Sequence, residues 1–193
     1  MITGSRLTAA AAVRWWPPIA LTAMVVLGIA VGKASTPLDD WFLYEAHIRW
    51  LRPFLLFFVE PRVLMLLYAL GVVIALWQRR WLMATLAAVA PVVALITARL
   101  CKMLFGREID HILAYPSGHV TVMTTVLGML VLVAHRRVWA IVAATFAGLA
   151  GMLGASTTFH YFTDAVGAVL LGTAVVCVVI VILDRRRARL DAT

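Results

Sequence analysis

Apolar runs close to 20 residues long recur along the chain, separated by short charged clusters. A helix rises about 1.5 Å per residue, so about 20 apolar residues cross the roughly 30 Å of hydrocarbon in a bilayer. The pattern predicts an all-α polytopic membrane protein, a single domain over residues 1–193 with short tails at 1–16 and 184–193. The predicted spanning helices are 17–34, 62–78, 82–101, 119–135, 138–156 and 161–183.

Composition supports this class, because 64% of the residues are hydrophobic and only 13% are charged. An ordinary soluble domain has roughly a quarter of its residues charged, so a soluble globular protein is excluded. The net charge of +8 could indicate nucleic acid. The basic residues, however, lie in short clusters beside apolar runs, which is typical of membrane topology signals. We therefore expect membrane lipids as partners and no nucleic acid.

Six spans place both termini on one side of the membrane. That side carries ten arginines against two aspartates, whereas the other side carries seven basic and seven acidic residues. The positive-inside rule then makes the termini cytoplasmic. The first apolar run could be a cleaved signal peptide, since Arg14 precedes it. The arginine clusters alternate correctly only with six spans, which favours a retained anchor. Between the first two spans, residues 41–58 mix aromatic and charged residues and predict an interfacial helix on the outer surface.

Two polar segments fall on the outer side, where ionisable groups at the membrane boundary are costly and often functional. Residues 102–119 join the third and fourth helices, and residues 160–164 open the sixth. His160 and Asp164 are four residues apart, so on a helix they would share one face. A carboxylate that binds one imidazole nitrogen leaves the other as a directed base or nucleophile. Taken alone, such a pair is more often a polar helix start.

A Pro-Ser-Gly-His run at 116–119 begins the fourth helix. Ser117 can cap that helix, and Gly118 lets a ligand approach the backbone closely. Free amides at a helix N-terminus attract an anion such as phosphate. An ordinary helix start with His119 at the wet interface is the alternative for this run alone.

The coincidence of these groups on one side of the membrane favours a phosphate site. Two histidines, His119 and His160, and a carboxylate, Asp164, fall there with two nearby cations, Lys102 and Arg107.

At these residues the chain resembles the type 2 phosphatidic acid phosphatase (PAP2) superfamily of membrane lipid phosphatases. The motifs of that family read KxxxxxxRP, PSGH and SRxxxxxHxxxD. The run at 116–119 fits the second motif at all four positions, and His160 and Asp164 fit the third. The order of the motifs and the six-span topology also match, so the resemblance implies a PAP2-like helical bundle.

The resemblance implies a mechanism without metal or cofactor. His160 would attack phosphorus to form a phosphohistidine, Asp164 would orient it, and His119 would protonate the leaving lipid oxygen. Phosphate binding would fall to Lys102, Arg107, Ser117 and Gly118.

Two arginines of the family pattern are missing. Counted from Lys102, the Arg-Pro pair falls on Ile109 and Asp110. Counted back from His160, the Ser-Arg pair falls on Leu153 and Gly154. In the family these arginines grip the phosphate oxygens, a task suited to a planar, permanently charged fork.

Three explanations of the missing arginines stay open. Lys102 and Arg107, with Arg99 one turn earlier, supply the charge from shifted positions, helped by the hydroxyls of residues 156–158. Alternatively, the substrate carries a compensating group, or the protein binds lipid phosphate with little turnover. We favour altered but active catalysis.

The preferred function is a metal-independent lipid phosphatase that acts on a lipid phosphate or diphosphate at the outer face of a bacterial inner membrane. A polyprenyl phosphate is favoured because the arginine-, alanine- and valine-rich composition suggests a GC-rich genome, in which a cell-wall carrier is a natural substrate. Three rival classes are a lipid phosphotransferase, a weakly catalytic lipid-phosphate-binding protein, and a haem or metal carrier. The carrier would leave Asp164 and the run at 116–119 unexplained.

Overall fold

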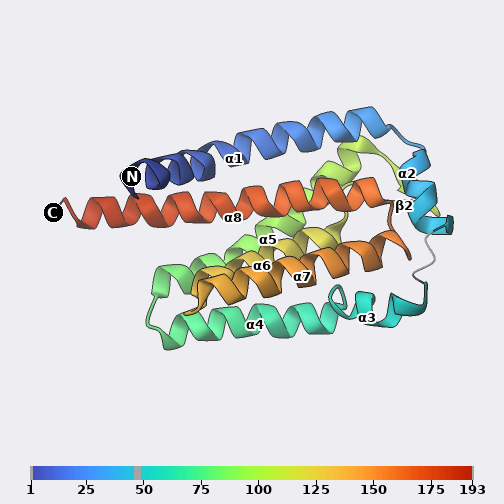
Figure 1. The fold of residues 1–193 in the computed structure, drawn as a ribbon. Helices are drawn as coiled ribbons and strands as arrows, with labels where there is room; N and C mark the ends of the chain where they lie inside the picture. The colour runs from blue at the N-terminus through green and yellow to red at the C-terminus, as the bar shows by residue number, and fades with distance from the viewer. Residues whose placement is uncertain (1, 46–48, 193) are drawn as a thin grey trace.

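A computed structural model describes residues 2–45 and 49–192. Within this part of the chain, six long helices coincide with the six predicted apolar runs, which confirms the all-helical architecture. Figure 1 shows them running alongside one another, with the N- and C-termini at one end and α2, α3 and β2 at the other. The long helices are α1 (Ile2–Val31), α4 (Pro61–Trp77), α5 (Trp81–Phe105), α6 (Gly118–Val133), α7 (Arg137–Ser156) and α8 (Phe162–Leu190).

Four of these helices are long and apolar enough to cross a membrane: residues 11–31 of α1, and the whole of α5, α7 and α8. The apolar helices α4 and α6 are shorter, at 17 and 16 residues. The chain therefore has the helices of an integral membrane protein, while the six-span arrangement and its orientation stay predictions.

Three helices extend beyond their predicted ends. α1 and α8 continue into the two segments expected to be short tails. The end of α8 is favoured by Arg187 and Arg189, since cations in the last turn interact well with the helix dipole. α5 continues to Phe105 and ends where Gly106 adopts a φ of 58°, a left-handed conformation that glycine permits. Lys102 consequently lies in the last turn of α5.

The segment predicted as one interfacial helix forms several short helical turns. Most of their aromatic side chains, among them Trp41, Trp50 and Phe54, are exposed, as expected of a segment at a membrane surface. The residues between these turns, 46–48, include His47 and lie outside the described part of the chain. The turns are α2 (Pro37–Asp40), η1 (Trp41–Glu45), η2 (Arg49–Leu51) and α3 (Arg52–Phe57).

Between α5 and α6 the chain forms a small antiparallel hairpin of β1 (Glu108–Ile109) and β2 (Ile112–Leu113). Its two turn residues, Asp110 and His111, both have positive φ, as a type I′ turn requires. The hairpin occupies the positions at which the Arg-Pro pair of the PAP2 pattern was expected.

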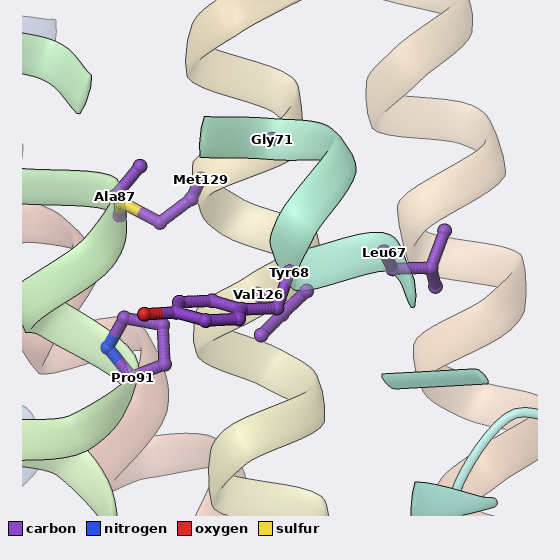
Figure 2. Close-up of a pocket in the computed structure, with 7 residues that line it drawn as sticks. All are labelled: Leu67, Tyr68, Gly71, Ala87, Pro91, Val126 and Met129. Atoms are coloured by element: carbon purple, nitrogen blue, oxygen red, sulfur yellow. The ribbon is translucent and has the colours of Figure 1, made fainter. Parts of the chain in front are cut away.

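Helix packing relies on small side chains that let the backbones approach closely. The buried residues of α5 include Ala84, Ala94 and Ala98. Figure 2 shows an apolar gap between α4, α5 and α6, where the ring of Tyr68 lies beside Pro91. The Tyr68 hydroxyl donates a hydrogen bond of 2.9 Å to the carbonyl of Ala88, so this polar group is satisfied within the bundle.

Candidate functional site

The structure brings together the two polar segments singled out in the sequence. The backbone N–H of Ser117 donates a hydrogen bond of 3.1 Å to the carbonyl of Asp164. The Ser117 hydroxyl caps α6 by accepting a hydrogen bond of 3.4 Å from the N–H of Val120, which confirms the predicted cap. The start of α6 and the start of α8 therefore form one site at the end of the bundle away from the termini.

Tyr115 fixes the turn that leads into α6. Its buried ring lies against α1 and α8, and its hydroxyl donates a hydrogen bond to the carbonyl of Met24. A Cβ atom at Gly167 would lie only 2.5 Å from the Tyr115 hydroxyl oxygen. The missing side chain of Gly167 thus makes room for Tyr115, which positions the following residues 116–119.

The two candidate catalytic histidines face the same space. The ring centroids of His119 and His160 are 6.4 Å apart. His160 is 6% exposed, whereas His119 is an exposed residue at the first turn of α6. Phe159 contacts both rings, with centroid distances of 5.5 Å to His119 and 5.3 Å to His160. A buried imidazole and an exposed one are thereby placed side by side, as the predicted nucleophile and acid would be.

Asp164 lies behind His160. The Nδ1 atom of His160 is 3.7 Å from Oδ2 of Asp164, which is longer than a hydrogen bond, and Nδ1 is buried without a hydrogen-bond partner. The two residues do not share a helix face, because α8 begins at Phe162, after His160. The same Asp164 oxygen accepts a hydrogen bond of 3.2 Å from the N–H of Tyr161. A catalytic hydrogen bond that is long without substrate commonly shortens when substrate binds.

Arg107 is fully buried, and both of its terminal nitrogens have partners. Nη1 donates to Oδ1 of Asp164 at 2.8 Å and to the hydroxyl of Thr163 at 2.7 Å. Nη2 donates to Oδ2 of Asp39 at 2.7 Å and to the carbonyl of Ala34 at 2.9 Å. The sequence-based prediction that Arg107 binds phosphate stays a prediction, and these contacts favour a role in building the site.

Asp39 is a site residue that the sequence reasoning missed. Its carboxylate accepts hydrogen bonds from the N–H of Thr163 at 2.9 Å and from the Thr36 hydroxyl at 2.8 Å, in addition to the bond from Arg107. Burial raises the pKa of Asp39, but the hydrogen bonds from Thr163, Arg107 and Thr36 outweigh it, and the pKa lies below its ordinary value. The available sequence signal was local: Thr36 and Asp39 form a capping box at α2.

Lys102 and Gly118 lie where the sequence placed them, beside this site. Lys102 Nζ donates one hydrogen bond of 2.7 Å to the carbonyl of Leu113, and Lys102 interacts electrostatically with Asp164. An ammonium group carries three donors. Gly118 is the first residue of α6 and is only partly buried. Both residues therefore have N–H groups from which a phosphate oxygen could accept a hydrogen bond.

The second missing arginine corresponds to Gly154, and close packing leaves no room there for a side chain. A Cβ atom at Gly154 would lie 2.7 Å from the backbone carbon of Leu55 on α3. One turn before Leu55, the guanidinium of Arg52 donates a hydrogen bond through Nη2 to the carbonyl of Thr157. Arg52 is half-buried, and its Nε is buried without a hydrogen-bond partner. Arg52 lies outside every motif, and its contact to Thr157 spans 105 residues, so no local pattern in the sequence indicates it.

No cluster of three His, Cys, Asp or Glu side chains suited to a metal ion occurs within residues 2–45 and 49–192.

Comparison with protein families gives a match over the C-terminal part of the chain. Residues 101–188 match the model of the PAP2 superfamily, a range that runs from the end of α5 through most of α8 and includes His119, His160 and Asp164. No curated protein and no solved structure matches the chain.

Proposed function

We propose that the chain is a member of the PAP2 superfamily and that it hydrolyses a lipid phosphate or diphosphate through a phosphohistidine intermediate. The match of residues 101–188 to this family, whose activities are phosphatase and phosphotransferase reactions on lipid phosphates, supports the proposal. The observation that carries this proposal is the facing pair of His119 and His160, 6.4 Å apart, with Asp164 behind His160. This spacing suits a phosphoryl group held between an attacking nitrogen and a proton donor.

In the first step, Nε2 of His160 attacks phosphorus, and the bond from phosphorus to the lipid oxygen breaks. His119 gives its proton to that oxygen, so the lipid leaves as an alcohol, or as a monophosphate when the substrate is a diphosphate. The Asp164 carboxylate stabilises the positive charge that develops on the His160 ring. In the second step, His119 takes a proton from water, the hydroxide attacks the phosphohistidine, and phosphate leaves with His160 restored.

Phosphate oxygens would be held by groups that still have donors to offer. Lys102 and the N–H groups at the start of α6, at Gly118 and His119, fit this role. Ser117 supports the turn, since its N–H and its hydroxyl already have partners within the protein. We assign Arg52 as the main guanidinium for the phosphate, because Arg107 has both terminal nitrogens engaged.

The location of the site favours a lipid substrate at the outer membrane face. His119 is in the first turn of α6 and His160 just precedes α8. The start of α8 lies at the end of the bundle away from both termini (Figure 1), and the charge distribution predicts that end to be extracytoplasmic. A polyprenyl phosphate or diphosphate is our preferred substrate, in a bacterial inner membrane.

The test is phosphate release by detergent-purified protein from polyprenyl phosphates, polyprenyl diphosphates and phosphatidates. We expect release that persists in EDTA and is abolished in His160→Ala. Release that EDTA abolishes and a divalent cation restores would contradict the metal-independent mechanism.

A phosphotransferase is the second candidate within the same chemistry. It would form phosphohistidine yet release little phosphate until an acceptor lipid is added. A weakly catalytic binding protein is favoured only by residues 109 and 154, where the pattern expects arginines and the chain has isoleucine and glycine. Lipid binding without phosphate release would identify it.

A further inference from the structure

We infer that Asp39, outside every motif of the sequence, is a positioning residue for this reaction: it offsets the charge of Arg107, so that the Asp164 carboxylate remains an effective negative partner for His160. The expected effect of Asp39 on catalysis rests on the proposed function. Its structural part, the electrostatic coupling of Asp39 to His160, can be tested without activity.

Three charged side chains are buried together beside His160. Arg107 lies between two carboxylates, 2.7 Å from Asp39 and 2.8 Å from Asp164, and all three side chains are completely buried. The low pKa of Asp39 keeps it ionised at neutral pH. Two carboxylates and one guanidinium give the group a formal net charge of −1.

The position of His160 makes this charge balance matter. Arg107 binds Oδ1 of Asp164, whereas the other oxygen, Oδ2, faces Nδ1 of His160 at 3.7 Å. If Arg107 had no second carboxylate, it would neutralise Asp164 alone, and the His160 ring would face a neutral pair. Interactions between buried charges are weakly screened, so one charge at this depth has a large effect on a neighbouring ring.

Asp39 also fixes the backbone that carries the pair. It accepts a hydrogen bond of 2.9 Å from the N–H of Thr163, in the first turn of α8, and one of 3.0 Å from the N–H of Thr36. The segment before α2 is thereby tied to the start of α8, one residue from Asp164. A role through structure alone must therefore be separated from the electrostatic role.

Other charged or titratable groups lie around the site that contains His160. The nearby groups are Asp164 and Tyr161 at the start of α8, His119 on α6 with Glu60 acting on it, Lys102 on α5, and Arg52 on α3 at the carbonyl of Thr157. None of these changes in the variants below, so a change in the titration of His160 reports on Asp39 and Arg107.

The experiment is a pH titration of the His160 ring by NMR in detergent micelles, with the resonance assigned by His160→Gln. We expect Asp39→Asn to lower the midpoint of this titration by about one pH unit, because the imidazolium loses a stabilising charge. Asp39→Glu keeps the charge and should leave the midpoint close to that of the wild type. Asp40→Asn is the matched control: it removes the neighbouring carboxylate, which is only half-buried, and should change nothing.

A double variant separates charge from structure. Asp39→Asn with Arg107→Met removes one negative and one positive charge, so the site regains a net negative charge although more contacts are lost. We expect its midpoint to return toward the wild-type value. A purely structural role predicts a larger disturbance in the double variant than in Asp39→Asn, and that result would overturn the inference.

Phosphate release measured on the same proteins links the coupling to catalysis. We expect Asp39→Asn to lower kcat at least tenfold with little change in KM, and to move the acidic limb of the rate profile to lower pH. A normal kcat with a shifted titration would overturn the catalytic part. If the wild type releases no phosphate from any lipid, the proposed function fails, whereas the NMR titration still decides the coupling.

Discussion

Nη1 of Arg107 lies 2.8 Å from Oδ1 of Asp164, and both side chains are fully buried. This contact joins the one arginine left in the first motif region to the carboxylate behind the candidate nucleophile. Removing one partner of a buried ion pair leaves an uncompensated charge, which costs about 3–5 kcal/mol. A structural role of Arg107 therefore predicts a loss of stability on its removal, whereas a phosphate ligand would affect substrate binding.

Arg107→Ala should destabilise the protein rather than simply weaken substrate binding. We expect a large loss of thermal stability in detergent, because Asp39 and Asp164 would be left buried with one fewer cation. Arg62→Ala, on the exposed first turn of α4, is the control and should be nearly neutral. A stable Arg107→Ala protein with only a raised KM would instead show that Arg107 binds phosphate.

The pKa of Asp39 predicts how stability depends on pH. Because this pKa is lowered in the folded protein, the stabilisation by Asp39 is complete above its unfolded value of about 3.9 and is lost as the pH falls through the folded value. The difference in thermal unfolding temperature between the wild type and Asp39→Asn should be largest near neutral pH and should shrink below about pH 4. A difference that stays constant down to pH 3 would contradict an ionised, hydrogen-bonded Asp39.

Restoring the arginine of the third motif should damage this protein. A Cβ at Gly154 already meets the backbone of Leu55 at 2.7 Å, so the larger side chain of Gly154→Arg must displace α3. We expect lower thermal stability and no gain in phosphate release. Higher activity with unchanged stability would show that the position is open to an arginine after all.

Arg52 should affect substrate binding more than folding. We expect Arg52→Ala to raise KM about tenfold, since a charge-assisted hydrogen bond to phosphate contributes about 1.5–3 kcal/mol. Arg52→Lys should recover only part of the loss because an ammonium cannot bind in bidentate fashion. Arg62→Ala serves as the matched loss of a positive charge. Equal KM values for Arg52→Ala and Arg62→Ala would remove Arg52 from the site.

Much of the architecture could be predicted from the sequence because apolar length and charge clusters are local signals. The helices and the Ser117 cap follow from residues within a few positions of one another. The family match over residues 101–188 confirms the resemblance stated from the motifs. Asp39 could not be found in this way, because its contacts to Arg107 and Thr163 span 68 and 124 residues and depend on tertiary packing.

The roles of Arg107 and Arg52 also depend on tertiary packing, which local sequence patterns do not contain. Spacing identified Arg107 as the cation nearest to position 109, where the family pattern expects an arginine. In the structure the chain turns at Asp110 and His111 to form a hairpin after Arg107, and the Arg107 side chain is buried. Arg52 contacts Thr157 across 105 residues, a relationship that no local pattern contains.

The central claim is that phosphate passes through a covalent bond to His160. The most direct measurement is to mix the wild-type protein with a polyprenyl phosphate or diphosphate that carries a radiolabelled terminal phosphate, quench in base within the first turnover, and locate the label by peptide mapping. We predict an acid-labile, base-stable phosphoryl group on His160 that is absent from His160→Ala. Normal turnover in His160→Ala, or label on another residue, would contradict the account.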